Sequence, residues 1–272
     1  MRRALFCVAL LAGCTTPGPS SISTPKPDGG SEQIPVSVRL PEGKGPFPAV
    51  VILHDCSGLG PRSSGAPERW AKLLLQRGYA VIIPDSFSTR GFPGGVCTDP
   101  SPTRFDVRPI RRVDDAYAAL EHARSLPQID PKHIGVMGGS HGGTTTVLAA
   151  SARRHGFAAA IALYPGCFPR PAPYRVSAPL LILAGEKDDW TPAEPCRRLA
   201  ETAAAAGQPV TIKVYAGAQH AFDSSFPVRY VDTRMNANSP TGRGATTGGD
   251  PEAWADSIRQ VEAFFARYLK PN

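Results

Sequence analysis

Apolar and polar positions along this chain follow two periods, one typical of buried strands and one typical of amphipathic helices. Short apolar runs predict strands near residues 34–40, 48–53, 79–83, 132–137, 158–163, 179–184 and 210–215. Patterns with a helical period lie near residues 66–77, 109–125, 142–154, 193–206 and 251–269. This alternation predicts an α/β domain, with a mainly parallel sheet that helices cover on both faces.

The run Gly138-Gly139-Ser140-His141-Gly142 lies between a predicted strand and a predicted helix. This order is typical of a Gly-x-Ser-x-Gly nucleophile elbow, a sharp turn from which the serine hydroxyl projects. The flanking glycines allow the backbone to turn tightly without a Cβ clash. Ser140 is therefore the candidate nucleophile.

Two further candidates follow Ser140 in the order that a serine hydrolase of this kind uses, first an acid and then a histidine. Asp188 lies just past the predicted strand at 179–184, and Asp189 is a second choice. Either aspartate could instead cap the helix that begins near Pro192. His220 follows the strand at 210–215. The sequence predicts that His220 takes the proton of Ser140 while Asp188 orients its ring.

The transition state of such a reaction needs backbone N–H groups that bind the developing oxyanion. His141 follows the nucleophile and supplies one of them. The loop after the strand at 48–53 begins His54-Asp55-Cys56, and the N–H of Cys56 is the second candidate. No further histidine–carboxylate cluster supports a metal site at His54 and Asp55, so no metal is expected there.

The chain resembles the dienelactone hydrolase family of the α/β-hydrolases over roughly residues 34–269. The resemblance rests on the Ser140 elbow and on four further motifs: His54-Asp55-Cys56, Pro84-Asp85-Ser86-Phe87, Gly185-Glu186-Lys187-Asp188, and Gly217-Ala218-Gln219-His220-Ala221-Phe222. It implies an α/β-hydrolase fold, no cofactor, and hydrolysis of a small-molecule ester or lactone. Typical members use a cysteine nucleophile, whereas this elbow carries serine. That departure favours a general carboxylic ester hydrolase.

The N-terminus predicts export. Met1-Arg2-Arg3 is basic and an apolar run follows, too short to span a bilayer. Leu11-Ala12-Gly13-Cys14 resembles a bacterial lipobox, which implies a signal peptide over 1–13 and a lipid on Cys14. Residues 14–33 are rich in Pro, Ser, Thr and Gly and predict a disordered tether. The hydrolase domain would then span 34–272, anchored by lipid to the cell envelope and facing the periplasm or carried by the outer membrane.

Four cysteines remain once Cys7 and Cys14 are set aside, namely Cys56, Cys97, Cys167 and Cys196. An even number in an oxidising compartment permits disulfides, and three pairings are open. Topology favours Cys56 with Cys97 and Cys167 with Cys196. A reactive Cys56 thiol that takes part in catalysis is the rival hypothesis.

The net charge of +7 does not predict a nucleic-acid partner, because the basic residues are scattered along the 272-residue chain.

Two long loops could shape specificity. Residues 89–108 carry Arg90, Arg104 and Arg108, which either meet an anionic substrate or remain solvated. Residues 223–250 are either a mobile flap or a surface insertion.

The ordered set of Ser140, Asp188 and His220 predicts a serine hydrolase that works through an acyl-enzyme. Two alternatives remain open. An acyltransferase would use the same three residues, and an envelope binding protein could have kept the scaffold without catalysis.

Overall fold

We describe a computed structural model of the chain, covering residues 20–151, 154–168 and 174–270. The predicted signal peptide, Cys14 and the first part of the predicted tether lie outside these residues. Within them, no helix has the length and apolar character that a membrane span requires.

The described residues form an eight-stranded sheet in the order β1-β2-β4-β3-β5-β6-β7-β8, in which β3 to β8 are parallel. The parallel strands are β3 (Phe47–Leu53), β4 (Ala80–Pro84), β5 (Ile129–Gly139), β6 (Ala159–Leu163), β7 (Leu180–Gly185) and β8 (Val210–Tyr215). Strands β4, β6 and β7 are buried along their whole length, as expected for a sheet covered on both faces. The predicted fold class is confirmed.

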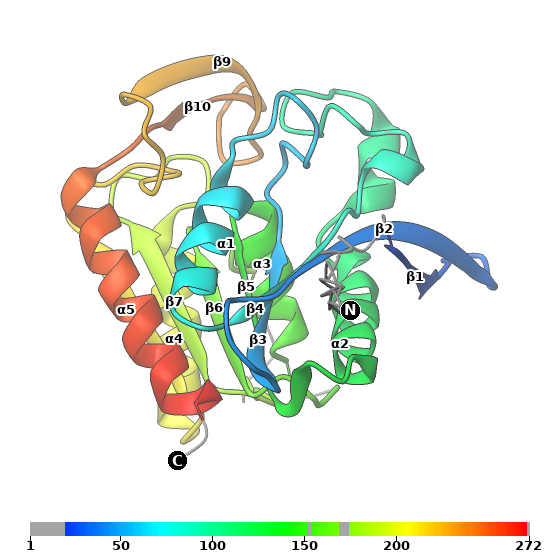
Figure 1. Cartoon of the computed structure of the whole chain (residues 1–272). Coiled ribbons are helices and arrows are strands. Elements are labelled where there is room, and N and C mark those ends of the chain that lie inside the picture. Colours follow the sequence, from blue (N-terminus) through cyan, green and yellow to red (C-terminus); the bar gives the residue numbers. More distant parts are fainter. Residues whose placement is uncertain (1–19, 152–153, 169–173, 271–272) are drawn as a thin grey trace, which may run out of the picture.

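Helices cover both faces of this sheet (Figure 1). Helices α1 (Ala66–Gln76) and α5 (Pro251–Leu269) pack Trp70 and Phe265 into the core on one face. The other core contains Leu120, Val147 and Leu199 from α2 (Arg112–Ser125), α3 (His141–Ala149) and α4 (Ala193–Ala205). Helix α3 is shorter than predicted, because Ser151 already pairs with Val176 in a β-bridge.

The prediction of a disordered tether is wrong for residues 20–33. Strand β1 (Ser20–Pro25) pairs antiparallel with β2 (Ser31–Arg39), which in turn pairs with β4. Ile22 and Thr24 point inward and are buried, and the Thr24 hydroxyl donates to Asp115 on α2 at 2.9 Å. Two alternate residues of β1 are therefore buried, which the polar composition of the segment does not reveal.

Residues 223–250, considered above as a mobile flap or a surface insertion, contain a β-hairpin. Strands β9 (Arg229–Met235) and β10 (Arg243–Thr247) pair with each other and lie beyond the carboxyl ends of the parallel strands (Figure 1). Thr247 forms a β-bridge with His220, and Met235 donates its N–H to the carbonyl of Cys97 at 2.9 Å. The hairpin is thus fixed to both sides of the rim where the predicted site lies.

Candidate active site

Ser140 lies at a tight turn between β5 and α3, with φ 52° and ψ −117°. Few side-chain-bearing residues adopt a positive φ, and such strain is typical of functional sites. The turn requires glycine at position 142, where a Cβ atom would lie 2.0 Å from the carbonyl oxygen of Leu53. The Ser140 N–H donates to the Leu163 carbonyl at 2.9 Å, which fixes the turn against β6.

The three predicted residues meet at this turn. The Oγ of Ser140 lies 2.9 Å from Nε2 of His220, and Nδ1 of His220 lies 2.8 Å from Oδ2 of Asp188. Each side chain follows its own parallel strand, and carboxyl ends of parallel strands share one edge of the sheet. All three residues are buried, with 7%, 2% and 3% of their surface exposed in the order Ser140, His220, Asp188.

Asp188 is held by donors on its own loop. Its Oδ1 accepts the N–H groups of Trp190 and Thr191 at 2.9 and 2.8 Å. The Thr191 hydroxyl lies 2.9 Å from Oδ2 of Asp188 and 3.0 Å from Nδ1 of His220. Asp188 can therefore hold the His220 ring in one orientation.

Asp189 has a different role from either of those predicted for it. Its carboxylate accepts the N–H and the hydroxyl of Thr246 on β10, both at 2.7 Å. Helix α4 has Pro192 at its N-cap without a side-chain cap, so Asp189 does not cap it. The two adjacent aspartates thus have different partners: Asp188 pairs with His220, whereas Asp189 accepts hydrogen bonds from Thr246 in the hairpin.

The aromatic rings of Tyr164 and Trp190, which the sequence did not single out, pack against the His220 imidazole. The ring of Tyr164 packs edge-on against the imidazole, with centroids 4.8 Å apart, and Trp190 packs at 4.7 Å. The Tyr164 hydroxyl and the Trp70 indole N–H both donate to Asp223, at 2.8 Å each. Burial raises the pKa of Asp223 and raises that of Tyr164 well above its ordinary value. No sequence motif signals Tyr164, whereas Asp223 could have been suspected from its place three residues after His220.

The two candidate oxyanion donors lie beside Ser140. Cys56, His141 and Ser140 line one cleft, whose volume is about 460 Å³. The N–H of Cys56 has no hydrogen-bond acceptor among the described residues, and His141, the first residue of α3, has no intrahelical acceptor. Both donors are therefore available to an oxygen atom in the cleft.

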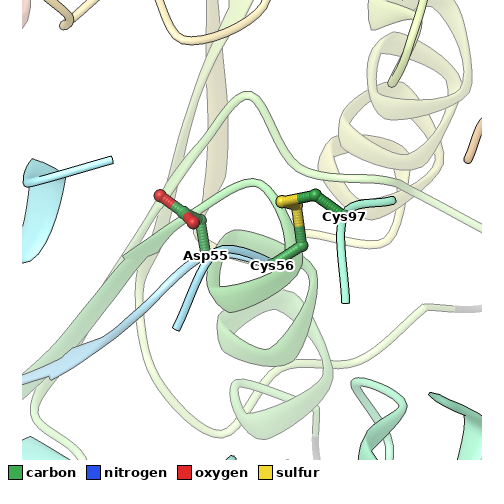
Figure 2. Close-up of side chains that lie close together, drawn as sticks. All are labelled: Asp55, Cys56 and Cys97. Atoms are coloured by element: carbon green, nitrogen blue, oxygen red, sulfur yellow. A yellow bond between two sulfur atoms is a disulfide. The ribbon is translucent and has the colours of Figure 1, made fainter. Parts of the chain in front are cut away.

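The disulfides join Cys56 to Cys97 and Cys167 to Cys196, as predicted. The rival hypothesis of a reactive Cys56 thiol is wrong, because its sulfur is in a disulfide. Asp55, Cys56 and Cys97 are the one close group of potential metal ligands in the described residues (Figure 2). Both sulfurs of that group are bonded to each other, so it does not offer a thiolate to a metal.

The His54–Asp55 pair stabilises the loop that presents Cys56. Asp55 accepts the N–H and hydroxyl of Ser57, at 2.7 and 2.5 Å, and the hydroxyl of Ser64. Nε2 of the fully buried His54 accepts the Ser86 N–H at 3.2 Å, and Nδ1 lies 2.8 Å from the Asp55 carbonyl oxygen. Burial, and next the charge of Arg112, holds the pKa of His54 well below its ordinary value. His54 is thus a neutral structural residue.

The cleft beside Ser140 is bounded mainly by apolar side chains, namely Val96, Phe105, Phe168, Trp190 and Met235. Arg104 and Arg108 also line it, whereas Arg90 does not. Arg90 instead pairs with Glu32 and Asp115, and its side chain is 6% exposed. Of the three arginines considered for an anionic substrate, Arg90 is therefore excluded.

Comparisons with known proteins agree with this architecture. The model of the dienelactone hydrolase family matches residues 34–269. The chain belongs to the dienelactone hydrolase family. It is accordingly a carboxylic ester hydrolase, and its substrate is a small-molecule ester or lactone.

Individual relatives are distant. A protein of Methylorubrum extorquens named "Putative carboxymethylenebutenolidase" is 26% identical over 213 residues, covering 72% of this chain and 70% of that protein. A Synechocystis protein of the same name is 23% identical, with coverages of 88% and 93%. A crystal structure titled as a putative dienelactone hydrolase from Klebsiella pneumoniae has a TM-score of 0.67 and 22% identity, covering 92% of this chain and 98% of that one. At this identity the structural likeness shows the fold alone.

Proposed function

We propose that this protein hydrolyses carboxylic esters through an acyl-enzyme on Ser140, with His220 as the general base and Asp188 as the residue that orients it. The observation that carries this proposal is the continuous pair of hydrogen bonds, 2.9 and 2.8 Å long, from the serine hydroxyl through the imidazole to the carboxylate. A serine hydroxyl is a weak nucleophile at neutral pH and needs an adjacent base of this kind.

In the first half-reaction, the Ser140 oxygen bonds to the ester carbonyl carbon while Nε2 of His220 accepts the hydroxyl proton. The oxyanion is bound by the N–H groups of Cys56 and His141. The tetrahedral intermediate then collapses, the ester C–O bond breaks, and His220 returns the proton to the leaving alcohol. Water repeats the sequence on the acyl-enzyme and releases the carboxylic acid.

The lining of the cleft supports an ester with an apolar group. A volume of about 460 Å³ bounded by aromatic and aliphatic side chains accommodates a group larger than acetyl. We therefore expect kcat/KM to rise from acetyl to butanoyl and hexanoyl esters of p-nitrophenol.

Replacing the nucleophile tests the proposal. We expect Ser140→Ala to fold normally and to lose at least ~10³-fold in turnover of p-nitrophenyl butanoate, together with all labelling by a fluorophosphonate probe. Ser37→Ala, an exposed position on β2, is the matched control and should retain both. Turnover by Ser140→Ala at the control rate would falsify the assignment. Product analysis with an added alcohol acceptor separates hydrolysis from acyl transfer.

We also propose that Cys14 carries a lipid that anchors the enzyme to the envelope. The lipobox-like sequence Leu11-Ala12-Gly13-Cys14 supports this, and only a short segment separates Cys14 from strand β1. The hydrolase body would therefore lie close to the membrane. Cys14→Ala should move the protein from the detergent phase to the aqueous phase in Triton X-114 partitioning, and an unchanged partition would contradict the anchor.

A further inference from the structure

We propose that the side chain of His141 is a specificity-determining residue: Arg112 orients it as a hydrogen-bond donor that recognises a second acceptor oxygen on the ester substrate. This inference rests on the proposed function, because it concerns the cleft beside Ser140. It assigns His141 a role separate from that of its backbone N–H.

The hydrogen bond between Arg112 and His141 determines which ring nitrogen carries the proton. Nη1 of Arg112 lies 2.7 Å from Nδ1 of His141. A guanidinium donates hydrogen bonds and accepts none, so Nδ1 must be the acceptor. In the neutral ring the proton then lies on Nε2.

The surroundings keep the His141 ring neutral and fixed. Burial, and next the charge of Arg112, holds the pKa of His141 well below its ordinary value. Burial lowers the pKa of Arg112 to about 10, so the guanidinium remains charged at neutral pH. Phe87 packs edge-on against the His141 ring at 5.6 Å, and the guanidinium lies over the same phenyl ring at 5.0 Å.

The Nε2–H group of His141 has no acceptor among the described residues, and His141 lines the cleft together with Ser140. Because His141 and Ser140 line the same cleft, an ester bound at Ser140 would lie near the His141 side chain. An oxygen atom of a bound substrate would supply the missing acceptor. Esters with a nearby ether, keto, hydroxyl or second ester oxygen have that chemistry.

Fold stability alone does not explain Arg112. Its side chain is fully buried, Nε and Nη2 have no hydrogen-bond partner, and no carboxylate of the described residues lies within ion-pair distance of it. Burying a charge in this way is costly. Among the residues that the structure describes, His141 is the one polar contact of this side chain, which identifies Arg112 as a positioning residue.

The first experiment compares esters that differ by one oxygen in place of a methylene group. The pairs are p-nitrophenyl methoxyacetate with p-nitrophenyl butanoate, and methoxyethyl butanoate with butyl butanoate. Their kcat/KM ratios are measured for wild type, His141→Phe, His141→Gln and Arg112→Met. Comparing each ratio between enzymes cancels the intrinsic reactivity of the esters.

We expect the preference for the oxygen-containing ester, in at least one pair, to fall about 2- to 12-fold in His141→Phe, the range for one hydrogen bond. His141→Gln, which keeps an N–H donor, should restore part of it, and Arg112→Met should lose part of it. Equal ratios in wild type and both His141 variants would overturn the proposal. If His141→Phe does not fold, the substrate ratios of His141→Gln and Arg112→Met, compared with those of wild type, provide the same test.

The second experiment reads the tautomer directly and does not depend on activity. Long-range ¹H–¹⁵N NMR of the histidine rings in Ser140→Ala should show His141 with the proton on Nε2 and an acceptor Nδ1. Arg112→Met in the same background should lose that fixed state. A proton on Nδ1 of His141 in Ser140→Ala would overturn the proposal even if the triad is correct. Conversely, the expected tautomer would stand if the proposed acyl-enzyme were disproved.

Discussion

Arg90 and Arg112 are both buried beneath the loops that build the site, but their partners differ completely. Arg90 donates to Asp115 at 2.6 and 2.7 Å and to Glu32 at 2.9 Å, so its charge is neutralised in place. Arg112 donates to a neutral ring, at 2.7 Å from His141. The first arrangement joins β2, α2 and the loop after β4, whereas the second controls one side chain in the cleft.

This difference separates residues that hold the fold from residues that shape the site. Removing one member of a buried ion pair leaves an uncompensated charge, whereas removing an unpaired charge leaves none. Replacing Arg90 by Met should therefore lower the stability of the fold and leave the substrate preference unchanged. The same replacement at Arg112 should change the substrate preference and have little effect on stability.

The largest expected effect on stability is at Arg90. Arg90→Met leaves Asp115 buried without its counter-ion and should lower the free energy of unfolding by roughly 3–5 kcal/mol. Arg112→Met should cost far less, or even stabilise the fold. Urea unfolding of both variants measures the contrast, and equal losses of unfolding free energy would contradict the different roles of Arg90 and Arg112.

The two disulfides extend the comparison. Each closes a loop, with a sequence separation of 41 from Cys56 to Cys97 and of 29 from Cys167 to Cys196. Replacing either pair by alanine should cost about 2–4 kcal/mol of stability. Because Cys56 and Cys97 line the cleft, only their loss should also raise KM for p-nitrophenyl butanoate. A similar rise in KM for Cys167→Ala/Cys196→Ala would show that the first bridge has no special role in the site.

Buried neutral histidines make stability depend on pH. The pKa values of His54 and His141 are lowered in the fold, chiefly by burial, and return to about 6.5 on unfolding. The unfolded chain therefore binds more protons below that pH. Their contribution is complete above about pH 6.5 and is lost as the pH falls toward the folded pKa values, at up to about 1.4 kcal/mol per pH unit for each histidine.

Chemical denaturation between pH 7.5 and 5.0 tests this linkage. His54→Asn keeps a donor near the position of Nδ1 but does not titrate, so its stability should fall less steeply than that of wild type. His155→Gln, at an exposed position, is the control and should follow the wild-type slope. A slope unchanged by His54→Asn would contradict the buried neutral state of that residue.

The smallest effect is expected at the hairpin. Asp189→Ala removes two hydrogen bonds to Thr246 and should cost about 1–2 kcal/mol. Faster hydrogen exchange in β9 and β10 should accompany a loss of only a few-fold in kcat/KM. Asp188→Ala, one position earlier, should instead abolish most activity, and equal activities of the two variants would contradict their assigned roles.

The sequence predicted the parallel strands, and it singled out Ser140, Asp188 and His220, which the structure brings within hydrogen-bond distance. Buried apolar runs and loop positions after strands carry strong local signals. The sequence missed β1 because only Ile22 in that segment is a large aliphatic residue, and the burial of Thr24 depends on Asp115, which lies 91 residues away. It also missed Arg112, because an arginine at the start of a helix has the pattern of a solvated residue. Its burial depends on Phe87 and His141, which tertiary packing alone brings together.

The turn at Ser140 is held by backbone hydrogen bonds to Leu163 and Thr144 and by the close approach that Gly142 allows, none of which uses the Ser140 side-chain oxygen. Serine and cysteine codons differ by a single nucleotide. Exchange of oxygen for sulfur at residue 140 would therefore leave the backbone hydrogen bonds of the turn in place.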